Sequence, residues 1–136
     1  TGEIVMRENT YGIVGTAHIG LPTNDLAKTI EFYRGLGFEV IMETVNEKAK
    51  EKVAFIQIKN YCIESFENGQ AAMKDGAYQH VALDVEDIEA TYSKICANNY
   101  EVITDGIEEL PFWENGVKFF MIKGPNEERI EFCQKL

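Results

Sequence analysis

Residues 18–41, HIGLPTNDLAKTIEFYRGLGFEVI, return in altered form as residues 80–103, HVALDVEDIEATYSKICANNYEVI. The two stretches align without a gap and share, among other positions, the histidine, Asp25/Asp87 and a closing Glu-Val-Ile. Further along, Ile63-Glu64 matches Ile130-Glu131, after three extra residues in the second copy. A repeat of roughly 60 residues predicts two similar supersecondary modules that share one core. We place them at about 14–68 and 76–134, within a single domain that covers 1–136.

Each copy predicts a strand, a helix and three further strands. The first helix has Asn24 or Asp25 as candidate N-cap, and the second has Asp87. Glycines at 35 and 37 and the asparagines at 98–99 are expected to end them. Strand-like runs follow at 38–44, 53–59 and 61–66, and again at 101–104, 117–123 and 129–133. We therefore predict an α+β fold of two tandem βαβββ modules, which form a curved, partly open barrel-like sheet with the helices outside.

Side chains alternate across a strand, so the repeat also predicts which face of each module carries polar chemistry. His18 lies opposite Ile19, which we expect to pack under the first helix, and His80 takes the matching position in the second copy. On the last strand of each module, Glu64 and Glu131 point to the same side as the histidines. We expect two imidazoles and two carboxylates in one concave cleft.

Carboxylates inside a curved sheet are costly to desolvate unless they meet a cation or take up a proton. A divalent metal removes that cost, because neutral imidazoles and carboxylates are common ligands of Zn, Ni, Co, Fe and Mn. Taken alone, one His–Glu pair is more simply a half-buried histidine beside a solvated glutamate. Two such pairs at matching repeat positions, in a chain with two histidines, predict a metal site at His18, Glu64, His80 and Glu131.

The composition excludes several classes of partner and location. The chain has 136 residues, 13 basic and 23 acidic, and a net charge of −10, which argues against nucleic acid or an anionic membrane as a partner. No apolar run is long enough to span a bilayer, and the first twelve residues lack the apolar core of a signal peptide. We expect a cytoplasmic protein whose three cysteines, Cys62, Cys96 and Cys133, are buried free thiols.

Several other residues are candidates for the substrate or for the core. Arg129 shares a face with Glu131 and is expected to pair with it or to hold a substrate anion. Phe66 and Met121 either line the cleft or pack in the core. Phe112 and Trp113, in an expected loop, either close over a ligand or anchor that loop on the core. The acidic pair Glu108-Glu109 is expected in a solvated loop.

The repeat, the segment IESFE and the ending GPNEERIEF together resemble the vicinal oxygen chelate superfamily, which contains glyoxalase I, epimerases, ring-cleaving dioxygenases and antibiotic-resistance proteins. The resemblance covers about residues 14–134 and implies paired βαβββ modules with one divalent metal in the cleft. The family's four ligand positions fall on His18, Glu64, His80 and Glu131. A carboxylate at Glu64 is most like the glyoxalase I branch.

This resemblance implies a lyase or isomerase that binds two adjacent substrate oxygens and stabilises an enediolate, with Glu131 or Glu64 moving the proton. An epimerase, an iron-dependent dioxygenase and a non-catalytic small-molecule-binding protein are the alternatives. Asn68 matches a glutathione-contacting asparagine, whereas Pro22 stands where glutathione-using members carry arginine. We therefore expect another hemithioacetal or hydroxycarbonyl substrate. The family also implies a homodimer, with the cleft formed within one chain or across two.

Overall fold

The structure, a computed structural model, describes residue 7 and residues 10–136. Much of the segment on which the signal-peptide expectation rests therefore lies outside the described residues. Module 1 (residues 14–68) contains β1 (Ile19–Thr23), α1 (Leu26–Gly35), β2 (Glu39–Asn46), β3 (Glu51–Ile58) and β4 (Tyr61–Glu67). Module 2 (residues 76–134, with β9 ending one residue later) contains β5 (His80–Asp84), α2 (Ile88–Ala97), β6 (Glu101–Val102), β7 (Glu108–Leu110), β8 (Val117–Lys123) and β9 (Arg129–Lys135).

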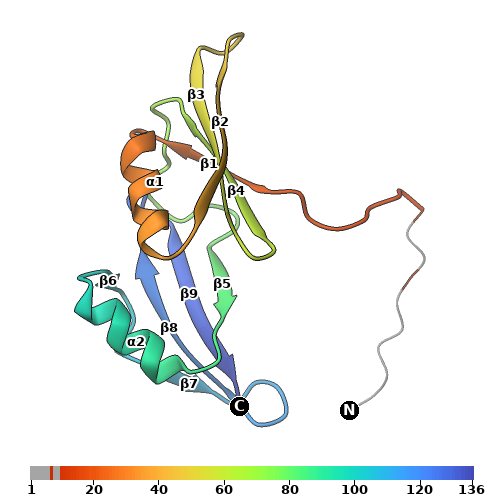
Figure 1. Cartoon of the computed structure of the whole chain (residues 1–136). Coiled ribbons are helices and arrows are strands. Elements are labelled where there is room, and N and C mark those ends of the chain that lie inside the picture. The colour runs from red at the N-terminus through yellow and green to blue at the C-terminus, as the bar shows by residue number, and fades with distance from the viewer. Residues whose placement is uncertain (1–6, 8–9) are drawn as a thin grey trace.

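The strands form two separate sheets, ordered β1-β4-β3-β2 in module 1 and β5-β9-β8-β6 in module 2, where β7 also pairs with β8. The first strand of each module runs parallel to the last, and the other pairings are antiparallel. One helix covers one face of each sheet, and Figure 1 shows both helices on the same side of the molecule. The α+β prediction is confirmed, with two open sheets and no closed barrel among the described residues.

The expectation of a solvated loop at Glu108-Glu109 is wrong, because these residues form β7. Leu110 pairs with Val117 and Glu108 with Phe119, on the edge of β8 that β6 occupies only at its other end. A strand of three exposed residues is too short to give a periodic signal in the sequence.

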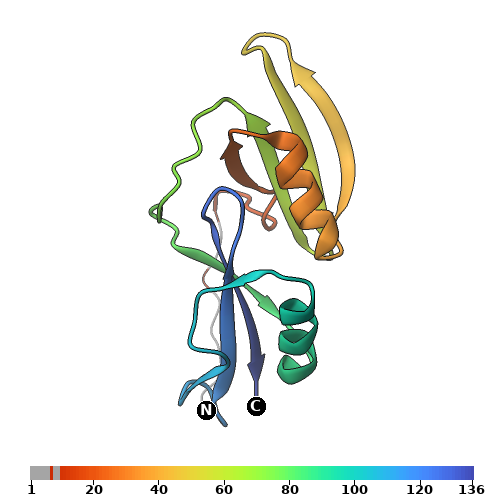
Figure 2. The ribbon, with the colours of Figure 1, turned by 90° about the vertical axis from the view of Figure 1, so that its left-hand side faces the viewer.

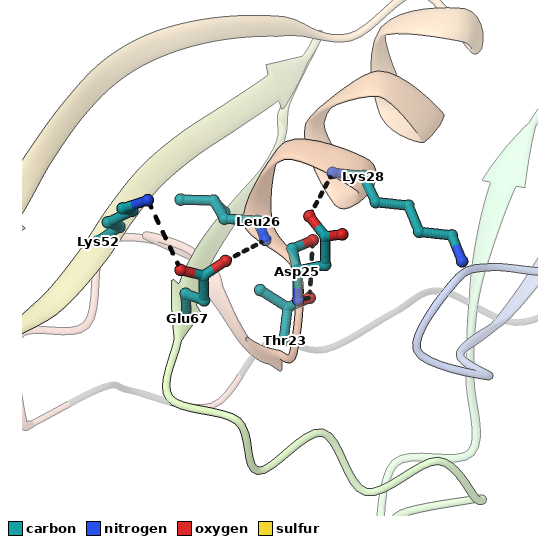
Figure 3. A network of polar contacts seen from close by, with 6 residues as sticks. All are labelled: Thr23, Asp25, Leu26, Lys28, Lys52 and Glu67. Carbon is teal, nitrogen blue, oxygen red and sulfur yellow. Dashed lines mark hydrogen bonds and ion pairs between the residues drawn. The ribbon is translucent and has the colours of Figure 1, made fainter.

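Both helices begin as the repeat predicts. Asp25 accepts a hydrogen bond from the Lys28 amide at 3.0 Å, and Asp87 accepts one from the Ala90 amide at 3.1 Å. A second acceptor comes from the last strand of each module. Figure 3 shows the first of these, Glu67 Oε1, which lies 2.9 Å from the Leu26 amide. In module 2 the Gln134 side chain takes the same role toward α2.

Under the helices, the apolar residues of both modules form one buried cluster. Ile63 and Ile130 lie there as expected, at 1% and 4% exposure. Ile19 does not, since it is 47% exposed at the start of an edge strand. Cys96 also differs from expectation, because it is exposed on α2, whereas Cys62 is half-buried and Cys133 buried; all three are free.

The β8–β9 turn, residues 124–128, joins module 2 to module 1. Its Asn126 side chain bonds to the hydroxyls of Thr23 and Thr29, at 2.9 and 3.0 Å, and all three residues are buried. Glu128 accepts a hydrogen bond from the Tyr33 hydroxyl at 2.9 Å. Figure 2 shows this turn reaching from the lower sheet toward β1 and α1. No helix among the described residues is long and apolar enough to cross a membrane.

Candidate metal centre

The first His–Glu pair lies on the open face of module 1, the face opposite α1. His18 directly precedes β1, and Glu64 lies on the neighbouring strand β4, where it pairs with Gly20. The parallel pairing brings His18 Nε2 to 3.3 Å from Glu64 Oε1. The side chains are 39% and 31% exposed, so both are accessible to a ligand from outside the chain.

The second pair repeats this arrangement on the open face of module 2. His80 begins β5, and Glu131 lies on β9 beside Ala82. His80 Nε2 is again 3.3 Å from Glu131 Oε1, with side-chain exposures of 37% and 17%. Each module thus presents one imidazole nitrogen and one carboxylate oxygen with the same separation.

This separation suits two ligands of one metal ion. Two atoms that each lie about 2.1 Å from a tetrahedral zinc ion are about 3.4 Å apart. Among the described residues, each glutamate makes ion-pair contact with its histidine and with no lysine or arginine. The donor types, imidazole nitrogen and carboxylate oxygen, also fit a divalent transition metal.

The two pairs do not meet within one chain. No group of three or more His, Cys, Asp or Glu residues with metal-binding geometry occurs among the residues the structure describes. A groove of about 790 Å³ runs between β1 and β5 and is lined by both His18 and His80, but neither Glu64 nor Glu131 lines it. Within the described part of one chain, the two His–Glu pairs are therefore separate and do not form one group of four.

The two histidine rings have different neighbours. The ring of His18 packs edge-on against Phe55, with centroids 5.5 Å apart. The ring of His80 has a polar partner, because its Nδ1 lies 3.0 Å from Oε1 of Gln79. Neither Gln79 nor Phe55 is among the residues predicted from the sequence. Gln79 could have been found in the sequence, because it directly precedes His80. Phe55 could not, because only the pairing of β3 with β4 brings it to His18.

Arg129 is not paired with Glu131. Its Nε lies 2.7 Å from Oδ1 of Asp75, in the segment that links the modules. Arg129 and Glu131 share a face of β9. The β5–β9 register puts Arg129 opposite His80, at the start of β5, and Asp75 lies in the linker only a few residues before that point. The expected pairing with Glu131 is therefore wrong: the salt bridge of Arg129 is with Asp75, which strand periodicity could not indicate.

The other predicted substrate residues lie at different places. Phe66 is half-buried on the open face of module 1, two residues beyond Glu64 on β4. Asn68 follows that strand, and its side-chain oxygen accepts a hydrogen bond from the Gln70 amide. Trp113 is 67% exposed in the β7–β8 loop, where Lys135 Nζ lies 4.0 Å from its ring centroid. Lys135 is four residues beyond Glu131 on β9, so Trp113 marks the far end of the open face of module 2.

Module 2 also has Asp84 and Cys133 near its His–Glu pair. The Cys133 thiol lies 3.6 Å from Asp84 Oδ1. Burial, followed by the charges of Asp84 and Glu131, raises the pKa of the Cys133 thiol to about 11. The thiol is therefore protonated at neutral pH, which does not suit a thiolate nucleophile or ligand.

Comparison with known proteins agrees with this architecture. Residues 15–132 match the model of the Glyoxalase/Bleomycin resistance protein/Dioxygenase superfamily. The uncharacterized protein YwbC of Bacillus subtilis is 30% identical over 125 residues, which covers 87% of this chain and 95% of that protein.

Two solved structures share the fold at lower sequence identity. A glyoxalase family protein from Enterococcus faecalis is 20% identical, with a TM-score of 0.74 over 88% of this chain and 97% of that one. The fosfomycin resistance protein FosX from Listeria monocytogenes, complexed with Mn(II) and sulfate, is 19% identical, with a TM-score of 0.67 over 91% and 94%. The family match spans both modules and both His–Glu pairs, and the chain belongs to the glyoxalase/bleomycin resistance protein/dioxygenase superfamily.

Proposed function

We propose that the chain is a metal-dependent lyase or isomerase of the glyoxalase I type. Its substrate is a small molecule with two adjacent oxygens, such as a hemithioacetal or a hydroxycarbonyl compound. The observation that carries this proposal is the pair of His–Glu contacts, each 3.3 Å long, at matching positions of the two modules. Two such contacts at matching positions favour a metal site over a protein that binds small molecules without metal.

In this proposal His18, Glu64, His80 and Glu131 hold one divalent ion, for which Ni, Co, Zn, Mn and Fe are candidates. When bound, the ion supplies Lewis-acid stabilisation of the negative charge that develops on the two substrate oxygens as the neighbouring carbon loses a proton. Supporting evidence is the chemistry of the donors and the separation within each pair.

Proton transfer is assigned to the glutamates. A carboxylate accepts the proton from one substrate carbon and returns it to the adjacent carbon, so the same side chain acts first as base and then as acid. Glu64 and Glu131 are both candidates, because each has a carboxylate oxygen on an open face and no Lys or Arg ion pair among the described residues.

We further propose that the site is assembled between two copies of the chain, each giving one half-site. Two observations support a homodimer. The two His–Glu pairs are separate within the described part of one chain, and an exposed apolar side chain lies on the strand row of the first pair. This side chain is Met42, which is 50% exposed. Met42 on β2 pairs with Phe55 on β3, and Phe55 pairs with Glu64 on β4. Exposed apolar residues beside a polar site are typical of an interface.

Phe66 and Trp113 are proposed as apolar walls for the substrate, and Asn68 as a polar contact. Phe66 is near Glu64, whereas Trp113 at the far end of module 2 would meet only an extended substrate. Arg129 keeps a proposed substrate role only if a substrate anion displaces Asp75.

The test is the metal-dependent turnover of Glu64→Gln and Glu131→Gln, measured with a panel of hemithioacetals and hydroxycarbonyl compounds after reconstitution with each candidate metal. We expect the variant of the glutamate that transfers the proton to lose about 10²–10⁴-fold in kcat, the usual contribution of a positioned acid–base group. The variant of the other glutamate should lose turnover through weaker metal binding. Glu67→Gln is the matched control, since Glu67 lies on the same strand but faces α1, and the natural counterpart Gln134 shows that an amide serves there. Unchanged turnover in both glutamate variants contradicts the proposal.

A further inference from the structure

We propose that residues 10–17, which lie just before β1, form an arm that two copies of the chain exchange, so that each arm lies in the groove between β1 and β5 of the other copy. The inference rests on the homodimer proposed above and names the surface that the two copies share. Two features of the molecule carry it: an exposed, uncharged segment before β1, and a groove between two strands that stand at the edges of their sheets.

The arm is apolar, uncharged and exposed to solvent. Residues 10–17, TYGIVGTA, contain no charged side chain and form no helix or strand. Tyr11, Ile13 and Val14 are 91%, 69% and 102% exposed. Figure 1 shows this part of the chain leading away from the body of the molecule beyond β1. Large apolar residues that are exposed together in one short stretch mark a segment that contacts another molecule.

The groove offers such a segment both apolar contacts and backbone partners. Its volume is about 790 Å³, and Leu21, Ile63 and Ile130 are among the apolar residues that line it. β1 and β5 stand at the ends of their sheets, and each pairs with one described strand only, β4 and β9 respectively. The outer edge of such a strand carries backbone N–H and C=O groups that have no strand partner. An extended segment in the groove can therefore hydrogen-bond to either edge.

The charges favour an uncharged occupant of the groove. Three acidic residues line it, and each has a partner: Asp75 bonds to Arg129, Glu127 to Lys123 and Glu128 to the Tyr33 hydroxyl. The net charge of the chain is −10, so two copies repel each other on average. Because residues 10–17 carry no charge, they can enter the groove of another copy without adding to that repulsion.

The position of the arm points to a second copy as its partner. Of residues 10–17, Thr16 lines the groove of its own chain, and the residues before it lead away from the body (Figure 1). Because the arm leaves the body at the groove, a two-fold axis beside the groove lets the two copies exchange arms reciprocally, which closes the assembly at a dimer. His18 and His80 also line this groove, so the exchange would hold the two copies together beside both proposed half-sites.

The direct test is a photo-crosslink from the arm. The photoreactive residue p-benzoylphenylalanine replaces Tyr11, and this unlabelled chain is refolded with an excess of ¹⁵N-labelled wild-type chain. We expect crosslinks from the unlabelled arm to labelled peptides that contain residues 16–22 or 74–81. The same probe at Phe112, which is 56% exposed in the β7–β8 loop, is the matched control and should not reach these residues. Crosslinks within one chain only, or to the partner outside the groove, would overturn the inference.

The second readout is the dissociation constant of the dimer, measured by sedimentation. We expect Val14→Asp to raise it about tenfold or more, because the added carboxylate would have to leave water to enter an apolar groove. Val45→Asp is the matched control and should leave the constant unchanged, since Val45 is 48% exposed on the face of β2 opposite Met42. An unchanged constant in Val14→Asp would also overturn the inference. A monomeric wild type contradicts the proposed homodimer and the arm exchange together, whereas a dimer without arm crosslinks contradicts the arm exchange alone.

Discussion

The two modules place a histidine against a glutamate with the same backbone arrangement but with different surrounding side chains. In both, a parallel pair of first and last strands brings histidine Nε2 to 3.3 Å from a glutamate oxygen, and an aspartate caps the helix that follows. The neighbours of the two pairs differ. The His18 ring contacts the edge of Phe55, whereas His80 contacts the side-chain amide of Gln79. The glutamate side chain is 31% exposed in module 1 and 17% exposed in module 2. The repeat therefore accounts for the two His–Glu pairs, whereas the residues beside them differ and make the two modules unequal.

A second difference lies in the last turn of each module. In module 1 a short connection, Lys59 and Asn60, joins β3 to β4, whereas five residues, 124–128, join β8 to β9. The three extra residues of the second copy are the ones that dock on module 1, through Asn126 and Glu128. An insertion that looks incidental in the alignment thus sets how the two halves of the chain are joined.

The largest effect on stability is expected when this connection is broken. Asn126→Leu removes the side-chain hydrogen bonds to Thr23 and Thr29, both fully buried. We expect a loss of about 2–3 kcal/mol in the free energy of unfolding, because buried hydroxyls are left with fewer partners. Asn60→Ala, at the exposed turn of module 1, should change it by no more than about 0.5 kcal/mol. Urea unfolding measures both, and equal effects would show that the longer turn does not join the modules.

The same junction should weaken at high pH. Burial, and then the charge of Glu128, raises the pKa of Tyr33 well above its ordinary value near 10. A raised folded pKa means that the stabilisation is fully present below pH 10 and is lost as pH rises toward the folded pKa. We expect stability to fall by up to about 1.4 kcal/mol per pH unit from Tyr33 in that window.

Tyr33→Phe should remove this share of the slope while leaving the share of Tyr61, whose pKa is raised to about 12, mainly by burial. Chemical unfolding at a series of pH values above 9 measures the effect. A slope that is the same in Tyr33→Phe and the wild type would show that Tyr33 is not protected by the junction.

The smallest effects should be the most nearly equal. Asp25→Ala and Asp87→Ala each remove one capping hydrogen bond at the start of a helix. Each is expected to lower the free energy of unfolding by about 1 kcal/mol. Thermal or urea unfolding of the two variants side by side tests whether the two caps contribute equally. If only one variant loses stability, the two modules share a backbone arrangement but not the energy of their caps.

Much of this arrangement follows from sequence periodicity, and the exceptions have physical causes. The repeat located both helices, the caps and the two His–Glu pairs, because strand alternation and helix signals are local. The repeat did not predict β7, because its three exposed residues carry no periodic pattern and become a strand only by pairing with the edge of β8. It also misassigned the partner of Arg129, because Asp75 approaches through a linker whose path depends on how the modules dock. Contacts between distant segments carry no periodic signal.

Whether the two unequal halves combine between chains is tested most directly by mixing two damaged proteins. One carries His18→Gln and Glu64→Gln, and the other His80→Gln and Glu131→Gln. Each alone should bind no metal at the site. Refolded together in equal amounts, they should recover about a quarter of the wild-type metal content, because half of the random dimers are mixed and each mixed dimer has one intact site of two. A mixture that binds no more metal than its parents would contradict a site shared between chains.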